Sequence, residues 1–248
     1  MGLWELFVLA VGLSMDAFSV AVCKGLSVCQ IRKKQILTVG LYFGFFQGFM
    51  PLVGYLLGSL SFSIILSRLR YRDDIRRHGS GNAGMTNTLR TYGKGAGAVV
   101  FVGDFLKGSL AVVLGHLIGG ELGGYLAGFF VVIGHLFPVF FGFRGGKGVA
   151  TAAGMILVMS PGTLLVLLVP FVLIIVLTRY MSLASITVAA LYPVVTLGRM
   201  LLAGWEPSKI LLGLFYSGVI GGLVIFMHRA NIGRLLRGEE SKLGKKKN

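Results

Sequence analysis

The chain has 248 residues, of which 55% are hydrophobic and only 13% are charged, and its mean hydropathy is +0.82. This composition lies far outside the soluble range and excludes a soluble enzyme or a soluble binding domain. The formal net charge of +15 suggests a nucleic-acid partner, but the basic residues lie in short segments between apolar runs, which argues against one. We therefore expect an all-α, polytopic integral membrane protein.

Eight apolar runs predict membrane helices. A bilayer core about 30 Å thick needs about 20 apolar residues per helix, and these runs lack the alternation of a membrane β-barrel. The last seven runs predict a seven-helix core, and the first predicts an extra N-terminal hydrophobic helix. The runs lie near Leu3–Val22, Thr38–Leu66, Ala96–Ile118, Tyr125–Phe143, Gly148–Met159, Thr163–Leu177, Leu183–Leu202 and Ile210–Met227.

Lysine and arginine are distributed unevenly over the connections between these runs. They gather at 67–95, in the Arg144–Lys147 turn, at Arg179 and in the tail at 229–247, whereas the alternate connections hold almost none. By the positive-inside rule, this pattern predicts that the basic connections face the cytoplasm. We expect the basic tail to lie on anionic lipid.

Two glycine-rich basic segments on this face predict an anion site. In the segment from His78 to Arg90, glycines can present backbone N–H groups, and Arg90 matches phosphate geometry; the alternative is an ordinary flexible loop. The second segment, Arg144 to Gly148, joins two apolar runs and adds Lys147. Together they predict a cradle for phosphate or carboxylate at the membrane surface.

Several polar residues in or near the spans allow two interpretations. Asp104 and Lys107 are three residues apart on one helix face, so they form either an internal ion pair that orients the helix or a functional site. His135 is either a packed histidine or a site residue close to the two loops. The segment His228–Ile232 is either an interfacial anchor or a polar lid over the site.

Other chemistries leave no pattern in this chain. Cys23 and Cys29 are too few for a metal site, and neither a Walker loop nor a dinucleotide fingerprint is present. No nucleophile-elbow context occurs either. We therefore expect neither a metal nor a cofactor, and the residues alone predict a membrane protein with a phosphate-binding site made from separate loops.

The motifs resemble those of the bacterial acyl-phosphate:glycerol-3-phosphate acyltransferases, the PlsY family, over about residues 50–245. Ser80 to Arg90 is similar to the family's Ser-Gly-Asn-x-Gly-Ala-Thr-Asn-x-x-Arg, with Met85 in place of alanine. Asp104 to Gly108 is similar to Asp-x-x-Lys-Gly, and Gly134 to Thr151 to Gly-His-x-x-Pro-x-Phe followed by Gly-Gly-Lys-Gly-Val-Ala-Thr. Further similarity occurs in Thr178–Ser185 and in His228–Leu235.

The resemblance implies a seven-helix enzyme of phospholipid biosynthesis in the bacterial plasma membrane, with its site facing the cytoplasm. It would transfer an acyl chain from acyl-phosphate to the 1-hydroxyl of glycerol 3-phosphate, giving lysophosphatidate and phosphate. By the same resemblance, the catalytic residues would be Ser80, Arg90, Lys147 and His228. The substrate-binding residues would be Gly81, Asn82, Thr86, Asn87, Lys107, Gly108, His135, Gly145, Gly146, Gly148 and Asn231.

The first residues do not fit that family. Residues 1–58 resemble the opening helices of the MntP-type manganese efflux family, in which Asp16 would lie on a cation pathway. The chain has no second aspartate-bearing half, so we expect a truncated transporter-like segment at 1–49 fused to an acyltransferase domain at 50–248. A cation (manganese) transporter and a lipid-binding scaffold without turnover remain as alternatives; the scaffold draws support only from Met85.

Overall fold

The computed structural model describes residues 33–244, and the chain divides into two compact units, Met1–Met50 and Pro51–Asn248. Of the first unit only Lys33–Met50 is described, and it is helical. The predicted helix at Leu3–Val22, the cation-pathway residue Asp16 and the last lysines of the tail lie outside the described residues.

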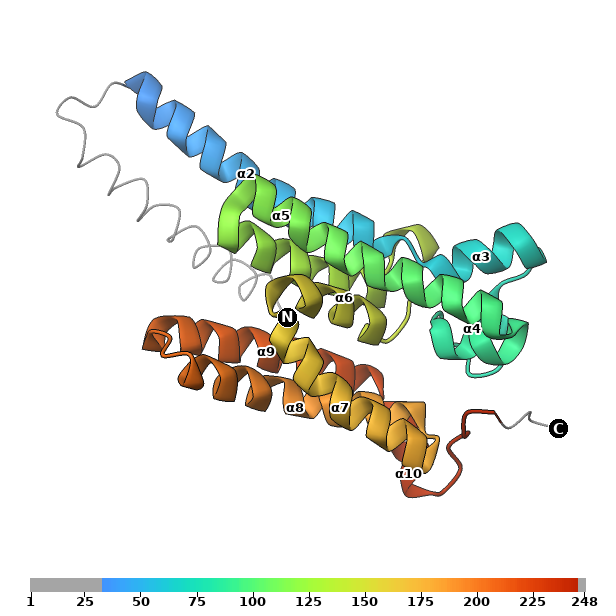
Figure 1. The fold of residues 1–248 in the computed structure, drawn as a ribbon. Coiled ribbons are helices and arrows are strands. Elements are labelled where there is room, and N and C mark those ends of the chain that lie inside the picture. The colour runs from blue at the N-terminus through green and yellow to red at the C-terminus, as the bar shows by residue number, and fades with distance from the viewer. Residues whose placement is uncertain (1–32, 245–248) are drawn as a thin grey trace. The chain divides into compact units, whose positions relative to one another are not determined.

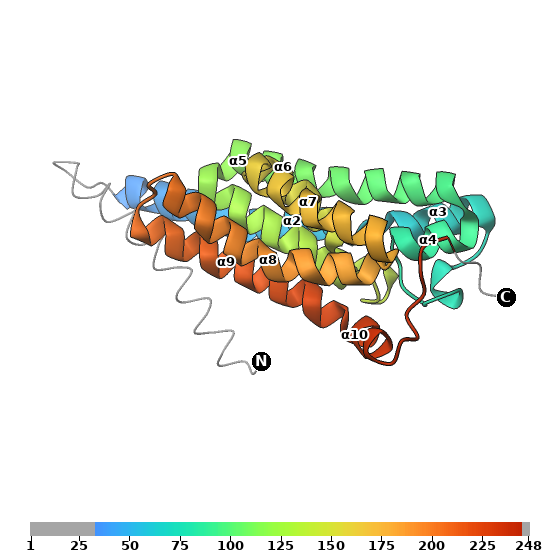
Figure 2. The ribbon, with the colours of Figure 1, turned by 60° about the horizontal axis from the view of Figure 1, so that its bottom comes forward.

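The described residues form helices and loops without any strand, which confirms the predicted all-α fold (Figures 1 and 2). Within residues 33–244, five helices are long and apolar enough to cross a membrane: Gly48–Tyr71, Lys94–Phe141, Pro161–Thr178, Met181–Leu202 and Pro207–Met227. The helical elements are α2 (Lys33–Ser59), α3 (Phe62–Tyr71), η1 (Ile75–Arg77), α4 (Met85–Tyr92), α5 (Lys94–Leu136), η2 (Val139–Phe141), α6 (Val149–Met159), α7 (Pro161–Thr178), α8 (Met181–Leu202), α9 (Pro207–Met227) and α10 (Arg229–Leu236).

The apolar run predicted as one helix at Thr38–Leu66 is broken in the structure. Helix α2 is helical from the first described residue, Lys33, to Ser59, and α3 begins only at Phe62. The break has a partner far along the chain, because Lys107 Nζ donates to the carbonyl oxygens of Gly58 at 2.9 Å and Leu60 at 2.7 Å. These bonds satisfy carbonyl groups that the interrupted helix leaves without the next turn.

The predicted helices Ala96–Ile118 and Tyr125–Phe143 are the two halves of α5. The chain reverses at Gly119 and Gly120, where φ of Gly120 is 62°, so the connection is shorter than predicted. The second half ends at Leu136 and not at Phe143, because Pro138 disfavours helical backbone at Phe137. The halves pack closely: a Cβ atom at Gly115 would lie 2.3 Å from the carbonyl oxygen of Gly123.

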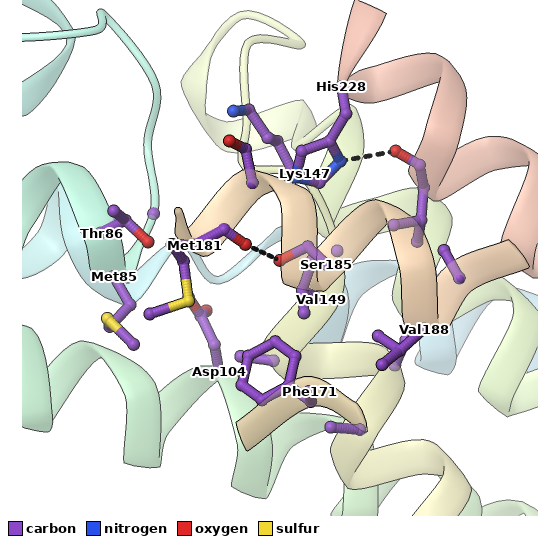
Figure 3. A pocket seen from close by; sticks show the side chains of 18 of the residues that line it. Met85, Thr86, Asp104, Lys147, Val149, Phe171, Met181, Ser185, Val188 and His228 are labelled. Atoms are coloured by element: carbon purple, nitrogen blue, oxygen red, sulfur yellow. Dashed lines mark hydrogen bonds between the residues drawn. The ribbon is translucent and has the colours of Figure 1, made fainter. Parts of the chain in front are cut away.

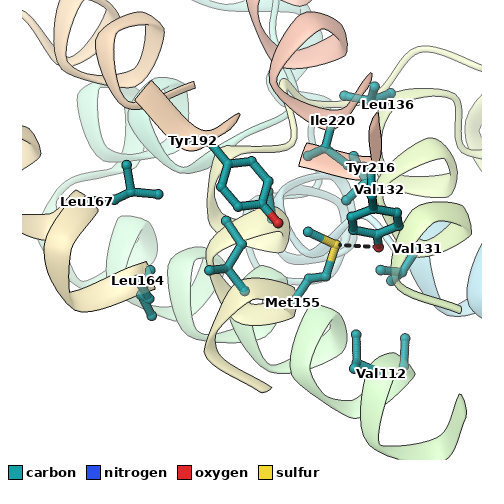
Figure 4. Packing of buried hydrophobic residues seen from close by; sticks show 13 residues of the cluster. Val112, Val131, Val132, Leu136, Met155, Leu164, Leu167, Tyr192, Tyr216 and Ile220 are labelled. Atoms are coloured by element: carbon teal, nitrogen blue, oxygen red, sulfur yellow. Dashed lines mark hydrogen bonds between the residues drawn. The ribbon is translucent and has the colours of Figure 1, made fainter. Parts of the chain in front are cut away.

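Helices α5 to α9 enclose the main apolar cluster (Figure 4). Its centre is Met155, whose sulfur accepts a 3.1 Å hydrogen bond from the Tyr216 hydroxyl. Small residues let the backbones approach, as is usual in membrane bundles. A Cβ atom at Gly58 of α2 would lie 2.2 Å from the Val131 carbonyl oxygen of α5.

The basic connections meet at one end of the second unit, as predicted. Arg76 donates to the Phe141 carbonyl oxygen at 2.6 Å, and the Leu243 N–H donates to the Arg179 carbonyl oxygen at 2.8 Å. Helix α10 contacts both α8 and α9. We call the surface made by residues 67–94, 142–148, 179–180 and 228–244 the basic face.

Candidate active site

A partly open cavity of about 430 Å³ joins the basic face to the apolar helices. In Figure 3 Lys147 and His228 lie at one end of it, and Phe171 and Val188 lie at the other. The polar lining residues are Ser80, Asn82, Thr86, Asn87, Arg90, Asp104, His135, Lys147, Ser182, Ser185, His228, Asn231, Arg234 and Glu240. The lining of the cavity, polar and basic at one end and apolar at the other, therefore suits an amphipathic ligand with an anionic end.

The first wall of the polar end is the loop before α4, and Asn87 holds that loop in place. Its buried amide nitrogen lies 3.0 Å from the carbonyl oxygen of His78 and 3.1 Å from that of Asn82, and its oxygen accepts from the Ser80 N–H at 3.0 Å. The Asn87 amide is therefore occupied by the loop itself. Its effect on a ligand is indirect, through the position of Ser80.

Asn82 offers the cavity an acceptor. Its side-chain oxygen is buried and has no hydrogen-bond partner among the residues that the structure describes. A buried polar atom of this kind is costly unless a ligand or water satisfies it. Since an amide oxygen accepts, it is suited to a hydroxyl group of a bound molecule.

The second wall is the turn before α6, which carries Lys147. The N–H groups of Gly145 and Gly146 donate to the carbonyl oxygens of Leu136 and His135, both at 3.1 Å, so these amides serve the turn and not a ligand. A Cβ atom at Gly146 would lie 2.1 Å from His135 Nε2. The two glycines therefore allow close packing, and Lys147 is the group that the turn presents to the cavity.

The third wall is formed by α10 and the segment that follows it. Lys147 Nζ donates to the Asn231 side-chain oxygen, and Asn231 Nδ2 donates to Glu240 Oε1 at 2.8 Å. Glu240 also accepts from Arg234 Nε at 2.7 Å, and Arg90 donates to the Ser241 carbonyl oxygen at 2.7 Å. Three cations and one carboxylate thus surround the polar end of the cavity.

The pKa of the Lys147 ammonium reflects the charges at this end of the cavity. Burial lowers the pKa of Lys147 to about 8, the Glu240 carboxylate opposes that shift, and the cations of Arg234 and Arg90 add to it. Lys147 is therefore protonated at neutral pH but close to its titration range. An arriving anion would stabilise the charged form.

His228, at the end of α9, is neutral at physiological pH. Burial, together with the neighbouring Lys147 cation, lowers the pKa of His228 to about 4. Its Nδ1 lies 2.7 Å from the Val224 carbonyl oxygen, which only accepts, so Nδ1 carries the proton. Nε2 is then left with a lone pair that can accept a hydrogen bond.

Asp104 and Lys107 form the internal ion pair that the sequence allowed. Asp104 Oδ1 lies 2.8 Å from Lys107 Nζ and 3.4 Å from His135 Nδ1, and all three side chains are buried. Asp104 and His135 touch the cavity, whereas Lys107 points to the end of α2. The structure therefore gives Lys107 a packing role that the motif did not indicate.

The cavity brings together ten of the predicted site residues. These are Ser80, Asn82, Thr86, Asn87, Arg90, His135, Lys147, Gly148, His228 and Asn231. Five others do not line it: Gly81, Lys107, Gly108, Gly145 and Gly146. Met85, the departure from the motif, lies on the wall (Figure 3).

Four polar cavity residues were missed by the sequence reasoning: Ser182, Ser185, Arg234 and Glu240. The family resemblance includes Arg234, in the segment His228–Leu235, but assigns it no role. Glu240 stands in a tail that was interpreted only by its positive charge. The signal that could have found it is the pair of acidic residues, Glu239 and Glu240, inside an otherwise basic segment.

Comparisons with known proteins identify one family. The family model described as glycerol-3-phosphate acyltransferase matches residues 48–238. The chain is 46% identical to a glycerol-3-phosphate acyltransferase of Syntrophomonas wolfei over 189 residues, which are 76% of this chain and 93% of the relative. It is 45% identical to one of Clostridioides difficile over 204 residues, which are 80% and 96% of the two chains.

Two solved structures share the fold. One is the crystal structure of PlsY, an integral membrane glycerol 3-phosphate acyltransferase, in its glycerol 3-phosphate form, with a TM-score of 0.70 and 39% identity. The other is the lysophosphatidic acid form, with a TM-score of 0.67 and 38% identity. Each match covers 79% of this chain and 94% of the solved chain.

Proposed function

This chain belongs to the glycerol-3-phosphate acyltransferase family, and we propose that it takes its acyl group from an acyl-phosphate. The acyl chain passes to the 1-hydroxyl of glycerol 3-phosphate, and the product is lysophosphatidate. One observation carries the proposal: a cluster of cations lies at the end of a cavity whose other walls are apolar. An acyl-phosphate joins a phosphate to an apolar acyl chain, and glycerol 3-phosphate brings a second phosphate to the same cations.

The reaction needs positioning more than a covalent intermediate. The hydroxyl oxygen of glycerol 3-phosphate attacks the carbonyl carbon of the acyl-phosphate, and an ester bond forms. The bond from that carbon to the phosphate oxygen breaks, and inorganic phosphate leaves. Because the acyl-phosphate is already activated, proximity and charge neutralisation are sufficient contributions from the protein.

The cations would hold the phosphate groups. Arg90 and Arg234 present planar forks, and Lys147 presents a compact charge to the same end of the cavity. The free acceptor of Asn82 and the Nε2 lone pair of His228 would orient the hydroxyl groups of glycerol. Ser80 would complete the set beside the leaving phosphate.

A phosphate oxygen would accept the proton of the attacking hydroxyl. His228, with its pKa lowered to about 4, is too weak a base at neutral pH. The phosphate of the acyl-phosphate gains negative charge as its bond to the carbonyl carbon breaks, so its oxygen is the stronger base. The proton then leaves with the inorganic phosphate, so that the protein returns to its starting state.

The membrane arrangement follows from the same proposal. We infer seven membrane helices, counting the two halves of α5 separately and including the short α6. The basic face would lie at the cytoplasmic surface, as the positive-inside rule favours. The apolar walls of the cavity, including Phe171 and Val188, would then receive the acyl chain from within the bilayer.

The domain division is also a proposal. The family match at 48–238 and the compact unit at 51–248 support an acyltransferase domain at 50–248. The resemblance of residues 1–58 to manganese efflux proteins stays a prediction.

An assay with both substrates tests the function. Purified protein in lipid, given palmitoyl-phosphate and glycerol 3-phosphate, should release phosphate and form lysophosphatidate in equal amounts. The variant Arg70→Ala, which removes an exposed cation of the basic face, should behave as the wild type. Phosphate release at the same rate without glycerol 3-phosphate would mean hydrolysis and would contradict the proposal.

The activity should fall in alkaline solution. Lys147 binds phosphate only while protonated, and its pKa is about 8, so kcat/KM for glycerol 3-phosphate should decline by up to about tenfold per pH unit above that value. Arginine keeps its charge over this range, so Lys147→Arg should be less active but lose the alkaline decline. An unchanged decline in that variant would assign it to another group.

A further inference from the structure

Glu240 is a buried carboxylate at the basic face, and the reaction proposed above gives it no role. It is only 8% exposed and belongs to the segment after α10. It accepts hydrogen bonds from Ser182 Oγ at 3.0 Å, Asn231 Nδ2 at 2.8 Å and Arg234 Nε at 2.7 Å. The donors come from α8 and α10, so the carboxylate ties the end of the chain to two helices.

A carboxylate beside a phosphate site lowers the affinity for phosphate, so its presence there calls for a physical reason. It repels a phosphate, and its burial costs free energy. Burial raises the pKa of Glu240, but the three donors outweigh that effect, and the carboxyl stays ionised at neutral pH. A persistent negative charge beside the anion site therefore needs an explanation other than ligand contact.

The hydrogen bonds of Asn231 supply the explanation. An asparagine amide has a donor end and an acceptor end, and its two orientations are otherwise similar. Because Glu240 accepts from Nδ2, the amide oxygen faces Lys147, whose ammonium donates to it. With the amide reversed, its NH₂ group would face the ammonium, and two donors would oppose each other.

We propose that Glu240 is a positioning residue: it fixes the orientation of the Asn231 amide, and through it the place of the Lys147 ammonium that receives the substrate phosphate. The inference rests on the proposed function. The same segment also holds Arg90 through the Ser241 carbonyl oxygen at 2.7 Å, and its Leu243 N–H bonds to the Arg179 carbonyl oxygen. Before Glu240, the Glu239 N–H donates to the Arg234 carbonyl oxygen at 2.8 Å, so the backbone is held on both sides of Glu240.

The charges around Lys147 give the inference a measurable signature. The ammonium is faced by Arg90 from α4, by His228 at the end of α9, by Arg234 from α10 and by Glu240. His228 is neutral and the two arginines repel the ammonium, so Glu240 is the group that favours its charged form. Removal of the carboxylate should therefore lower the pKa of Lys147.

The test compares Glu240→Gln with Glu239→Gln. Glu239 is the adjacent carboxylate, exposed and paired with Arg237, so it controls for the loss of one charge from the tail. In Glu240→Gln, kcat/KM for glycerol 3-phosphate should fall about tenfold, the loss expected for one charged hydrogen bond. The alkaline decline should also move to lower pH. A purely structural role would not move that decline.

A double variant shows whether Glu240 acts through Asn231. Combined with Asn231→Ala, Glu240→Gln should reduce kcat/KM by no more than about threefold beyond the worse single variant, because groups in one network are not additive. Losses that multiply would overturn the inference. So would a Glu240→Gln variant with the activity and pH profile of Glu239→Gln.

Glu240→Asp covers the case in which Glu240→Gln does not fold. It keeps the charge but draws the carboxylate back by one methylene, so the alkaline decline should stay in place while kcat/KM falls. Wild-type kcat/KM in this variant would overturn a positioning role. If the wild type itself produces no lysophosphatidate, the proposed function fails, which is a separate outcome.

Discussion

Replacement of Lys147 by methionine should lower kcat/KM for phosphate release by about 100-fold or more. This is the typical effect of removing a preorganised group that stabilises the negative charge developing in the transition state. Methionine keeps the length of the side chain and removes only the ammonium. The ammonium lies in a half-buried turn beside Asn231, where water screens its charge poorly. The loss should therefore appear with either substrate held at saturation.

The matched control is Lys209→Met. Lys209 is exposed near the start of α9, whereas His228 follows the end of that 21-residue helix, so the two lysines lie about 30 Å apart. This variant should retain wild-type kcat/KM. A loss of less than about threefold in Lys147→Met, with the protein folded, would place the phosphate elsewhere.

Replacement of Gly108 by alanine should destabilise the membrane bundle and not change substrate recognition. A Cβ atom there would lie 2.2 Å from the Thr151 carbonyl oxygen, and that neighbour is backbone, so α5 and α6 must move apart. Such overpacking typically costs about 1–3 kcal/mol. For a chain of this size, the unfolding temperature should fall by about 2–10 °C.

Thermal unfolding in detergent checks this prediction, with Gly222→Ala as the control. Gly222 is also a helical glycine, but an added Cβ meets nothing within 4 Å, so alanine there should leave the unfolding temperature unchanged or raise it slightly. A Gly108→Ala protein with wild-type stability and a raised KM would return Gly108 to the ligand site that its motif suggested.

The sequence alone predicted the fold class and most of the polar residues that line the cavity. Membrane helices follow from local composition, because each needs about 20 apolar residues whatever surrounds it. The charge pattern placed the basic connections on one face, and the contacts of Arg76 and Leu243 across that face agree. The motifs selected the residues whose side chains line the polar end of the cavity, among them Arg90, Lys147 and His228.

The roles within those motifs were decided by tertiary contacts. The resemblance predicts that Lys107 binds substrate, and that role stays a prediction. In the structure Lys107 donates to the carbonyl oxygens of Gly58 and Leu60, on either side of the break at Ser59, 48 residues earlier in the chain. The motif predicts that Gly145 and Gly146 cradle a phosphate, yet their N–H groups donate to the carbonyl oxygens of Leu136 and His135 at the end of α5. A motif records which residue types are present, and it does not record which partner each polar group finds.

Glu240 shows most clearly the difference between what the sequence predicts and what tertiary contacts decide. By composition it is one of two adjacent acidic residues in a basic tail, and the local sequence does not distinguish it from the exposed Glu239. Its three donors come from Ser182, Asn231 and Arg234, and the first of these is 58 residues away. The sequence by itself predicted a basic anion site at the membrane. Only the packing of residues 239–243 against α8 and α10 decided that the Glu240 carboxylate positions the groups of this site. The physical reason is that the role of a buried charge depends on the donors that surround it.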